Sequence, residues 1–273
     1  MRIVFLIFMF VLGGCIGSFL CCQVRRSEQK SRKRLGNRSI CLHCKRQLKW
    51  YDNIPILSWL VLGGKCRYCG QKIGYAEIIA EILMAVAFVM IGGILDVETM
   101  FTKALSIWDF IGYAIWALLF IETIILGYLA IYDGIYGKMP MPYLVISIVI
   151  GLLAMALRLA QAQELAYANA TATMFFDPAI SVLLYGGLYF VLYKVSKGKW
   201  VGDGDWLVGT AIALMLFSPW LTLIALFMAN AIACIVMLPA FLSKKRQKIY
   251  FAPFMVIAFI IVVTFTTFFQ NML

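Results

Sequence analysis

Residues 107–134 read IWDFIGYAIWALLFIETIILGYLAIYDG, an apolar stretch long enough to cross a bilayer that ends on the carboxylate of Asp133. The whole chain has this character: 63% of its 273 residues are hydrophobic and only 14% are charged, with a mean hydropathy of +0.91. A soluble domain of this length does not need so much apolar surface. The sequence therefore predicts an all-α polytopic membrane protein.

Eight apolar stretches predict about eight transmembrane helices. Ser218-Pro219-Trp220 fits either a turn or a kink, so seven helices are the alternative. The stretch at 3–22 resembles a signal peptide, but it is predicted to be a helix because about 20 apolar residues run directly into basic sequence. Residues 161–177 are predicted to form an outside loop. The predicted spans are 3–22, 77–95, 107–131, 143–160, 178–194, 207–217, 219–241 and 250–269.

Positive charge predicts the orientation in the membrane. With the N-terminus outside, 21 of the 24 Lys and Arg residues fall in cytoplasmic loops or at cytoplasmic helix ends, and 13 of them lie between residues 23 and 72. This asymmetry follows the positive-inside rule. A basic segment beside membrane spans predicts contact with anionic lipid headgroups, and nucleic acid is not expected as a partner.

Two Cys-x-x-Cys pairs in this basic segment predict a small zinc-ribbon-like insertion after the first helix. Cys41 and Cys44 are separated by 21 residues from Cys66 and Cys69, and four thiolates on two tight turns are typical of a structural Zn²⁺ site. Disulfides are the alternative, but cytoplasmic thiols stay reduced. His43, the only histidine, is expected to be a bystander. Metal binding would supply the free energy that so small a core lacks.

Two acidic residues on the predicted cytoplasmic face are the candidate catalytic groups. Asp133 ends one span and Asp205 begins another, and an acidic residue in such a position by default marks a function. A close pair of carboxylates shares a proton, so one serves as base and the other as acid. Gly202 and Gly204 would let a substrate backbone approach. Asp203 is the alternative partner for Asp133.

Elimination narrows the residue types that could carry out catalysis in this chain. With His43 in the cysteine segment, no histidine is left for a Ser-His or Cys-His nucleophile. Glu122 is expected to be paired inside the helix bundle. Loop acids such as Asp52 are expected to be solvated. Hydrolysis by this chain would therefore depend on carboxylates.

Together these residues resemble the bacterial type IV prepilin peptidases, which are leader peptidase/N-methyltransferases and Gly-x-Gly-Asp intramembrane aspartyl proteases. The resemblance is carried by Gly17-Ser18-Phe19-Leu20, the two cysteine pairs, Asp52-Asn53-Ile54-Pro55-Ile56-Leu57-Ser58-Trp59-Leu60 between them, and Glu81-Ile82-Leu83. It implies that Asp133 and Asp205 are the catalytic aspartates. The implied substrate is a prepilin or pseudopilin in the bacterial inner membrane. The resemblance also implies N-methylation of the new N-terminus with S-adenosylmethionine.

The resemblance implies three segments: the first transmembrane helix at 1–22, a cytoplasmic four-cysteine zinc domain at 23–76 and a transmembrane protease core at 77–273. Three departures from the family pattern weaken the expectation of ordinary substrate handling: Cys21, Leu207 and Lys138-Met139-Pro140-Met141. No glycine-rich loop is evident for the methyl donor. The alternatives are a presenilin-like intramembrane protease and a non-enzymatic membrane scaffold with a zinc module.

Overall fold

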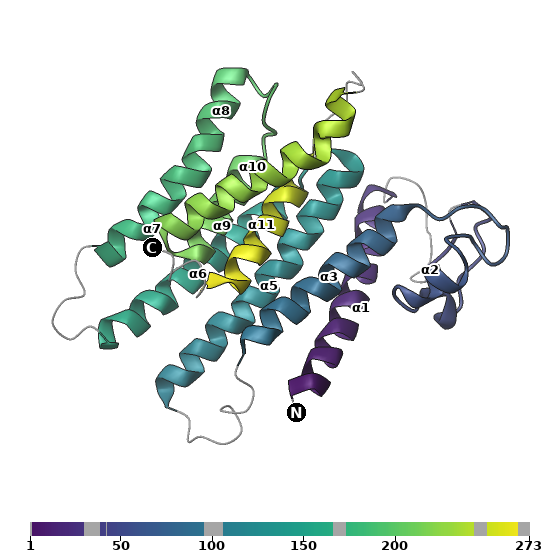
Figure 1. Cartoon of the computed structure of the whole chain (residues 1–273), viewed down its shortest axis with the longest axis horizontal. Coiled ribbons are helices and arrows are strands. Elements are labelled where there is room, and N and C mark those ends of the chain that lie inside the picture. The colour runs from purple at the N-terminus through teal and green to yellow at the C-terminus, as the bar shows by residue number, and fades with distance from the viewer. Residues whose placement is uncertain are drawn as a thin grey trace. The chain divides into compact units, whose positions relative to one another are not determined.

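The computed structural model describes residues 2–29, 39–41, 43–95, 106–165, 173–242 and 250–266 (Figure 1). Within these ranges the secondary structure is helical, with two isolated β-bridges and no strand. Three sets of residues lie outside these ranges: the basic residues of 30–38, those of the predicted cytoplasmic loop 242–249, and residues 166–172 of the predicted outside loop. The chain divides into unit 1, Met1–Thr99, and unit 2, Met100–Leu273.

Unit 1 is built on two long helices with a small module between them. The helices are α1 (Arg2–Gln29) and α3 (Tyr75–Ile94), and the module contains η1 (Trp50–Asn53) and α2 (Leu57–Val61). Unit 2 is a helical bundle. Its elements are α5 (Ile107–Tyr136), α6 (Met141–Leu165), α7 (Thr173–Val182), η2 (Leu183–Gly187), α8 (Leu188–Ser196), α9 (Asp205–Leu216), α10 (Pro219–Leu242) and α11 (Ala252–Thr264).

The predicted all-α membrane fold is confirmed within the described residues, where each of the eight apolar stretches forms a helix. Six spans are long and apolar enough to cross a membrane: α1, α3, α5, α6, α10 and the continuous run of α7, η2 and α8. The other two, α9 and α11, are shorter, with 12 and 13 residues. At Ser218-Pro219-Trp220 the chain turns: α9 ends at Leu216, Phe217 adopts φ +57°, and α10 begins at Pro219.

The short helix α9 lies at the centre of unit 2. It contacts α6, α7, η2, α8, α10 and α11. Nine of its 12 residues are buried, so protein rather than lipid surrounds most of its surface. A helix enclosed in this way does not need to match the thickness of the bilayer, since its neighbours shield its ends.

In unit 1 two glycines bring α1 and α3 into backbone contact (Figure 1). A Cβ on Gly13 would lie 2.5 Å from the carbonyl oxygen of Met84, and one on Gly17 would lie 2.7 Å from that of Ala80. This Gly-x-x-x-Gly spacing is the usual device by which membrane helices approach closely. The spacing is visible in residues 13–17, but this helix contact was not predicted.

We expect Gly13→Ala to destabilise unit 1 by about 1–3 kcal/mol, because the new methyl group meets backbone that cannot move aside. Gly14→Ala is the matched control on the same helix. Its Cβ would meet nothing closer than Pro55 Cβ at 3.4 Å, so it should be neutral. Unfolding of the detergent-solubilised protein, followed by denaturant titration, compares the two. Equal losses of stability would contradict the close helix contact.

Candidate functional site

Asp133 lies near the end of α5 and is buried, with 6% of its surface exposed. Its Oδ2 accepts a hydrogen bond from the backbone N–H of Ala252, the first residue of α11, at 3.3 Å. The first N–H groups of a helix have no partner within that helix and carry partial positive charge, so they suit a carboxylate. α5 closes on Gly137, whose positive φ of +63° allows its N–H to donate to the carbonyl of Asp133 at 2.7 Å. The Asp133 carboxylate is therefore held by a helix far away in sequence.

Asp205 is the first residue of α9 and is buried, with 3% exposed. Its Oδ2 accepts a hydrogen bond from the backbone N–H of Gly202 at 2.7 Å. Its Oδ1 is buried and has no hydrogen-bond partner among the described residues. Asp203, two residues earlier, is exposed in the turn before the helix. The two neighbouring aspartates therefore have different surroundings, and only Asp205 faces the interior of unit 2.

The segments that carry Asp133 and Asp205 meet in unit 2. The two carboxylates interact electrostatically. Met139, in the turn after α5, packs directly on Gly204, where an added Cβ would lie 2.7 Å from Met139 Sδ and 3.0 Å from its Cβ. Gly204 is thus a packing glycine, while Gly202 supplies a backbone donor to Asp205. Of the unusual Lys138-Met139-Pro140-Met141 stretch, Met139 therefore fills the space at the residue before the second aspartate.

Two tyrosines add polar groups beside this acidic pair. Tyr185 and Tyr189 both interact electrostatically with Asp205, and their rings lie 5.6 Å apart. The hydroxyl of Tyr189 accepts a hydrogen bond from Asn230 Nδ2 at 3.1 Å. The hydroxyl of Tyr185 is fully buried and has no partner among the described residues. Tyr185 lies on the π-helical segment η2, an irregularity often found at functional sites, and no sequence motif had pointed to it.

Glu122 is a third buried acid of unit 2 and is fully enclosed. One of its oxygens accepts a hydrogen bond from Ser147 on α6, as expected for a residue paired inside the bundle.

In unit 1 the four cysteines of the two Cys-x-x-Cys pairs converge. Their sulfur atoms all lie within 4.8 Å of one another, and Cys41 Sγ is 3.9 Å from Cys69 Sγ. A tetrahedral zinc with Zn–S bonds of about 2.3 Å places its sulfurs about 3.8 Å apart, so this set could hold one metal ion. None of the four is in a disulfide, and His43 is not part of the set.

The two cysteine turns repeat the same backbone geometry. In the first, the N–H of Lys45 donates to the carbonyl of Cys41, and in the second the N–H of Gly70 donates to that of Cys66. Each turn is closed by an isolated antiparallel bridge, Ile40↔Gln47 and Lys65↔Lys72. Lys45 and Gly70 occupy equivalent places with φ of +58° and +67°. This repetition favours a metal-binding ribbon, because each turn presents two sulfurs to one point.

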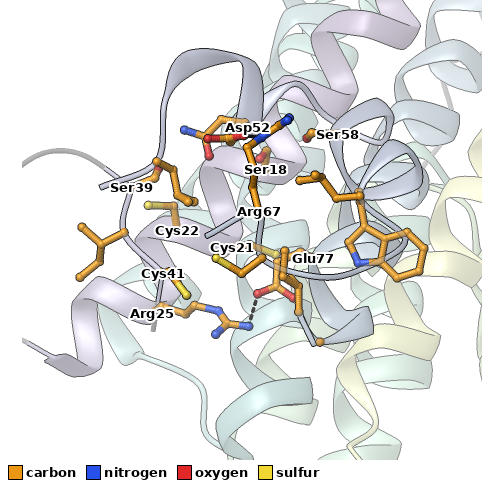
Figure 2. A pocket seen from close by; sticks show the side chains of 18 of the residues that line it. Ser18, Cys21, Cys22, Arg25, Ser39, Cys41, Asp52, Ser58, Arg67 and Glu77 are labelled. Atoms are coloured by element: carbon orange, nitrogen blue, oxygen red, sulfur yellow. Dashed lines mark hydrogen bonds and ion pairs between the residues drawn. The ribbon is translucent and has the colours of Figure 1, made fainter. Parts of the chain in front are cut away.

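Cys41 and Cys66 also line a cavity of about 410 Å³ in unit 1 (Figure 2). Arg25 on α1 and Glu77 on α3 form an ion pair at its wall. Helix α1 extends to Gln29, so Arg25 belongs to the helix and not to a loop. Sequence reasoning had assigned this arginine only to the basic segment that contacts lipid.

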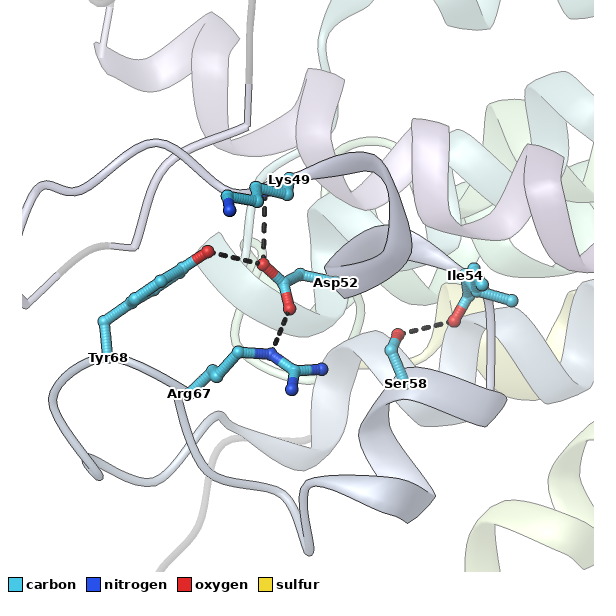
Figure 3. Close-up of polar contacts among 6 residues, drawn as sticks. All are labelled: Lys49, Asp52, Ile54, Ser58, Arg67 and Tyr68. Carbon is cyan, nitrogen blue, oxygen red and sulfur yellow. Dashed lines mark hydrogen bonds and ion pairs between the residues drawn. The ribbon is translucent and has the colours of Figure 1, made fainter.

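Asp52 was expected to be solvated, and that prediction is wrong. Only 2% of its side chain is exposed, and it is the centre of a hydrogen-bond network (Figure 3). Its Oδ1 accepts from Arg67 Nε at 2.7 Å, and its Oδ2 accepts from the Tyr68 hydroxyl at 3.0 Å and the Lys49 N–H at 3.2 Å. The network ties η1 to the second cysteine turn, a long-range contact that no local pattern reveals.

The Asp52 network favours the ionised carboxylate. Burial alone would raise the pKa of Asp52, but the donors from Arg67, Lys49 and Tyr68 outweigh it and hold the pKa below its ordinary value. The network's contribution to the free energy of unfolding is complete above the ordinary aspartate pKa of about 3.9. It is lost as the pH falls through the lower pKa that Asp52 has in the folded protein. At neutral pH the network is therefore fully formed.

Glu81 joins the module to the helix pair. Its Oε2 accepts a hydrogen bond from the backbone N–H of Ile56 at 2.7 Å. Ile56 adopts φ +63°, a conformation that a β-branched residue rarely takes unless its surroundings enforce it. Glu81 thus fixes the end of the Asp52-Asn53-Ile54-Pro55 stretch against α3.

Comparison with known proteins finds matches to residues of unit 1. The family model of the bacterial peptidase A24 N-terminal domain matches residues 11–93. The match covers most of α1, the cysteine module and most of α3. A prepilin leader peptidase/N-methyltransferase of Myxococcus xanthus is 42% identical over 84 residues, which are 31% of this chain and 25% of that protein. The resemblance predicted from the sequence is confirmed over this region.

Two further relatives agree. A prepilin leader peptidase/N-methyltransferase of Vibrio cholerae is 36% identical over 89 residues, covering 30% of this chain and 35% of that protein. A type 4 prepilin-like proteins leader peptide-processing enzyme of Escherichia coli is 47% identical over 53 residues, 19% of this chain and 20% of that protein. The matches thus span about a third or less of these relatives. No solved structure matches the chain significantly.

Proposed function

We propose that this chain is a membrane endopeptidase that cleaves the leader peptide of prepilin-like proteins at the cytoplasmic membrane face. Asp133 and Asp205 carry the chemistry in this proposal. The observation that supports it most is that two buried carboxylates, from distant parts of the sequence, lie on segments that pack together in unit 2 through Met139 and Gly204. One oxygen of Asp205 has no partner among the described residues. The curated relatives, which are named for prepilin processing, supply the substrate class.

The mechanism follows from one proton shared by two carboxylates. The ionised carboxylate takes a proton from water as the water oxygen attacks the scissile carbonyl carbon, and the protonated one donates its proton to the carbonyl oxygen. When the C–N bond breaks, the leaving amine takes a proton from the pair. The backbone N–H of Ala252 holds Asp133 in place, and that of Gly202 holds Asp205.

Methylation of the new N-terminus completes the proposed reaction. S-adenosylmethionine supplies the methyl group when bound. The new terminal amine of the cleaved product would be the acceptor of that methyl group. Names of the curated relatives support this second activity.

Asp133→Asn and Asp205→Asn are each expected to reduce cleavage of a prepilin-like substrate about 10²–10⁴-fold, because each removes one partner in proton transfer. Asp203→Asn is the matched control, since Asp203 lies two residues away but is exposed. Co-expression with the substrate, followed by measurement of its size, reports cleavage. Equal processing by the wild type and both buried-site variants would overturn the proposal that Asp133 and Asp205 are the catalytic pair.

We also propose that Cys41, Cys44, Cys66 and Cys69 hold one structural Zn²⁺. Four thiolates leave no open position on the metal, so its contribution is to folding of the module. Metal analysis of the purified protein should give about one zinc per chain, with a large loss in each Cys→Ser variant. His43→Ala should retain the metal. A loss in His43→Ala as large as in the cysteine variants would overturn the four-sulfur assignment.

A further inference from the structure

The short helix α2 of unit 1 exposes an apolar face. Leu57, Leu60 and Val61 are spaced i, i+3 and i+4, so they share one side of the helix, and 60%, 58% and 79% of their surfaces are exposed. No side chain from residue 53 to residue 64 is ionisable. An exposed apolar patch of this kind marks a surface that contacts a partner or a membrane.

The segment that leads into α2 lies beside the membrane-spanning parts of α1 and α3. A Cβ on Gly14 of α1 would lie 3.4 Å from Pro55 Cβ, and Glu81, in the second turn of α3, accepts the hydrogen bond from the Ile56 N–H. Gly14 precedes Cys22, the end of the apolar stretch, by eight residues, which correspond to about 12 Å along a helix. Figure 1 shows α2 alongside the two long helices rather than beyond their ends. Because α1 is long and apolar enough to cross a bilayer, Pro55 is level with the apolar part of α1 and not with its polar end.

The backbone of this segment is suited to apolar surroundings. The carbonyl of Ile54 accepts hydrogen bonds from the hydroxyl of Ser58 (Figure 3) and from its backbone N–H. The N–H of Ile56 is paired with Glu81, and Pro55 has no N–H. Non-helical backbone is tolerated at membrane depth only where its polar groups find partners within the protein, and these groups meet that condition.

We propose that α2 is inserted in the membrane as part of a re-entrant segment, with Leu57, Leu60 and Val61 in contact with lipid acyl chains. At the same level α1 and α3 expose apolar side chains of their own, among them Val11 and Leu83, as helices in contact with lipid do. The lipid that surrounds these two helices therefore also covers α2. A face in water, or a face covered by a protein partner, would not require the preceding proline to lie so far along α1.

Aromatic and basic residues mark the boundaries of the inserted segment. Trp50 and Tyr75, at the starts of η1 and α3, are exposed, and such side chains collect where hydrocarbon meets headgroups. The cysteine turns carry exposed cations, which suit anionic headgroups: Lys45, Lys65 and Lys72. The module would thus have its apolar tip in hydrocarbon and its basic turns at the membrane surface.

The inference uses unit 1 alone and does not depend on the proposed catalysis. It gives the small module a third attachment, to lipid, besides its packing on α1 and its hydrogen bond to α3. Failure to cleave a prepilin-like substrate would leave the inference standing, and a failure of insertion would leave the proposed catalytic pair in unit 2 unaffected.

The depth of α2 can be measured by power-saturation electron paramagnetic resonance on the full-length, zinc-loaded protein in lipid nanodiscs. A nitroxide attached to p-azidophenylalanine at Leu57, Leu60 or Val61 leaves the cysteines unmodified. Oxygen dissolves in acyl chains, whereas a neutral nickel chelate stays in water. We expect oxygen to relax the labels on α2 more strongly than the chelate does, and the order to reverse for the control label at Lys45, on an exposed cysteine turn.

Stronger relaxation of the α2 labels by the chelate would place the face in water and overturn the proposal. Weak relaxation by both reagents would overturn it too, since protein would then cover the face. With the label at Val61, Leu57→Lys/Leu60→Lys should shift the label toward the chelate, because a charge in hydrocarbon is unfavourable. The matched control Leu57→Ala/Leu60→Ala should keep it accessible to oxygen. Zinc content and the thermal midpoint check that each protein is folded, and the single-label comparison decides the question if the lysine variant is not.

Discussion

Burying a carboxylate among apolar helices is unfavourable because the carboxylate loses its hydration. Hydrogen-bond donors from elsewhere in the chain compensate for this loss. In unit 2 the N-terminus of α11 donates to Asp133, and Ser147 on α6 donates to Glu122. In unit 1 the carboxylate of Glu81 accepts a hydrogen bond from the backbone N–H of Ile56. Each acid therefore fixes one element to another.

The two units use different means to become rigid. In unit 1, α1 and α3 touch through Gly13 and Gly17, and the small module between them is organised by two equivalent cysteine turns and the Asp52 network. Such a module has little apolar core of its own. Ionic contacts and a metal ion would therefore supply the stabilisation that apolar burial does not. In unit 2 the enclosed helix α9 carries Asp205 into the bundle.

Sequence reasoning predicted the helical spans, the four-cysteine set and the two aspartates, because hydropathy, Cys-x-x-Cys spacing and acids at span ends are local signals. It did not predict the burial of Asp52, whose side-chain donors, Arg67 and Tyr68, come 15 and 16 positions later. Nor did it find Tyr185, since an unpaired hydroxyl has no sequence signature. The residues alone did not separate Asp203 from Asp205, and the Gly-x-Gly-Asp resemblance selected Asp205. The fold adds that Asp205 is buried and Asp203 is exposed.

The central claim is that Asp133 and Asp205 act as one catalytic unit. Residues of such a unit are strongly non-additive, because removing either partner already disables the shared proton transfer. Cleavage rates of Asp133→Asn, Asp205→Asn and the double variant on one prepilin-like substrate test this directly. The account predicts that the double variant retains about the same residual rate as the single variants. A double variant whose loss equals the product of the two single losses would contradict it.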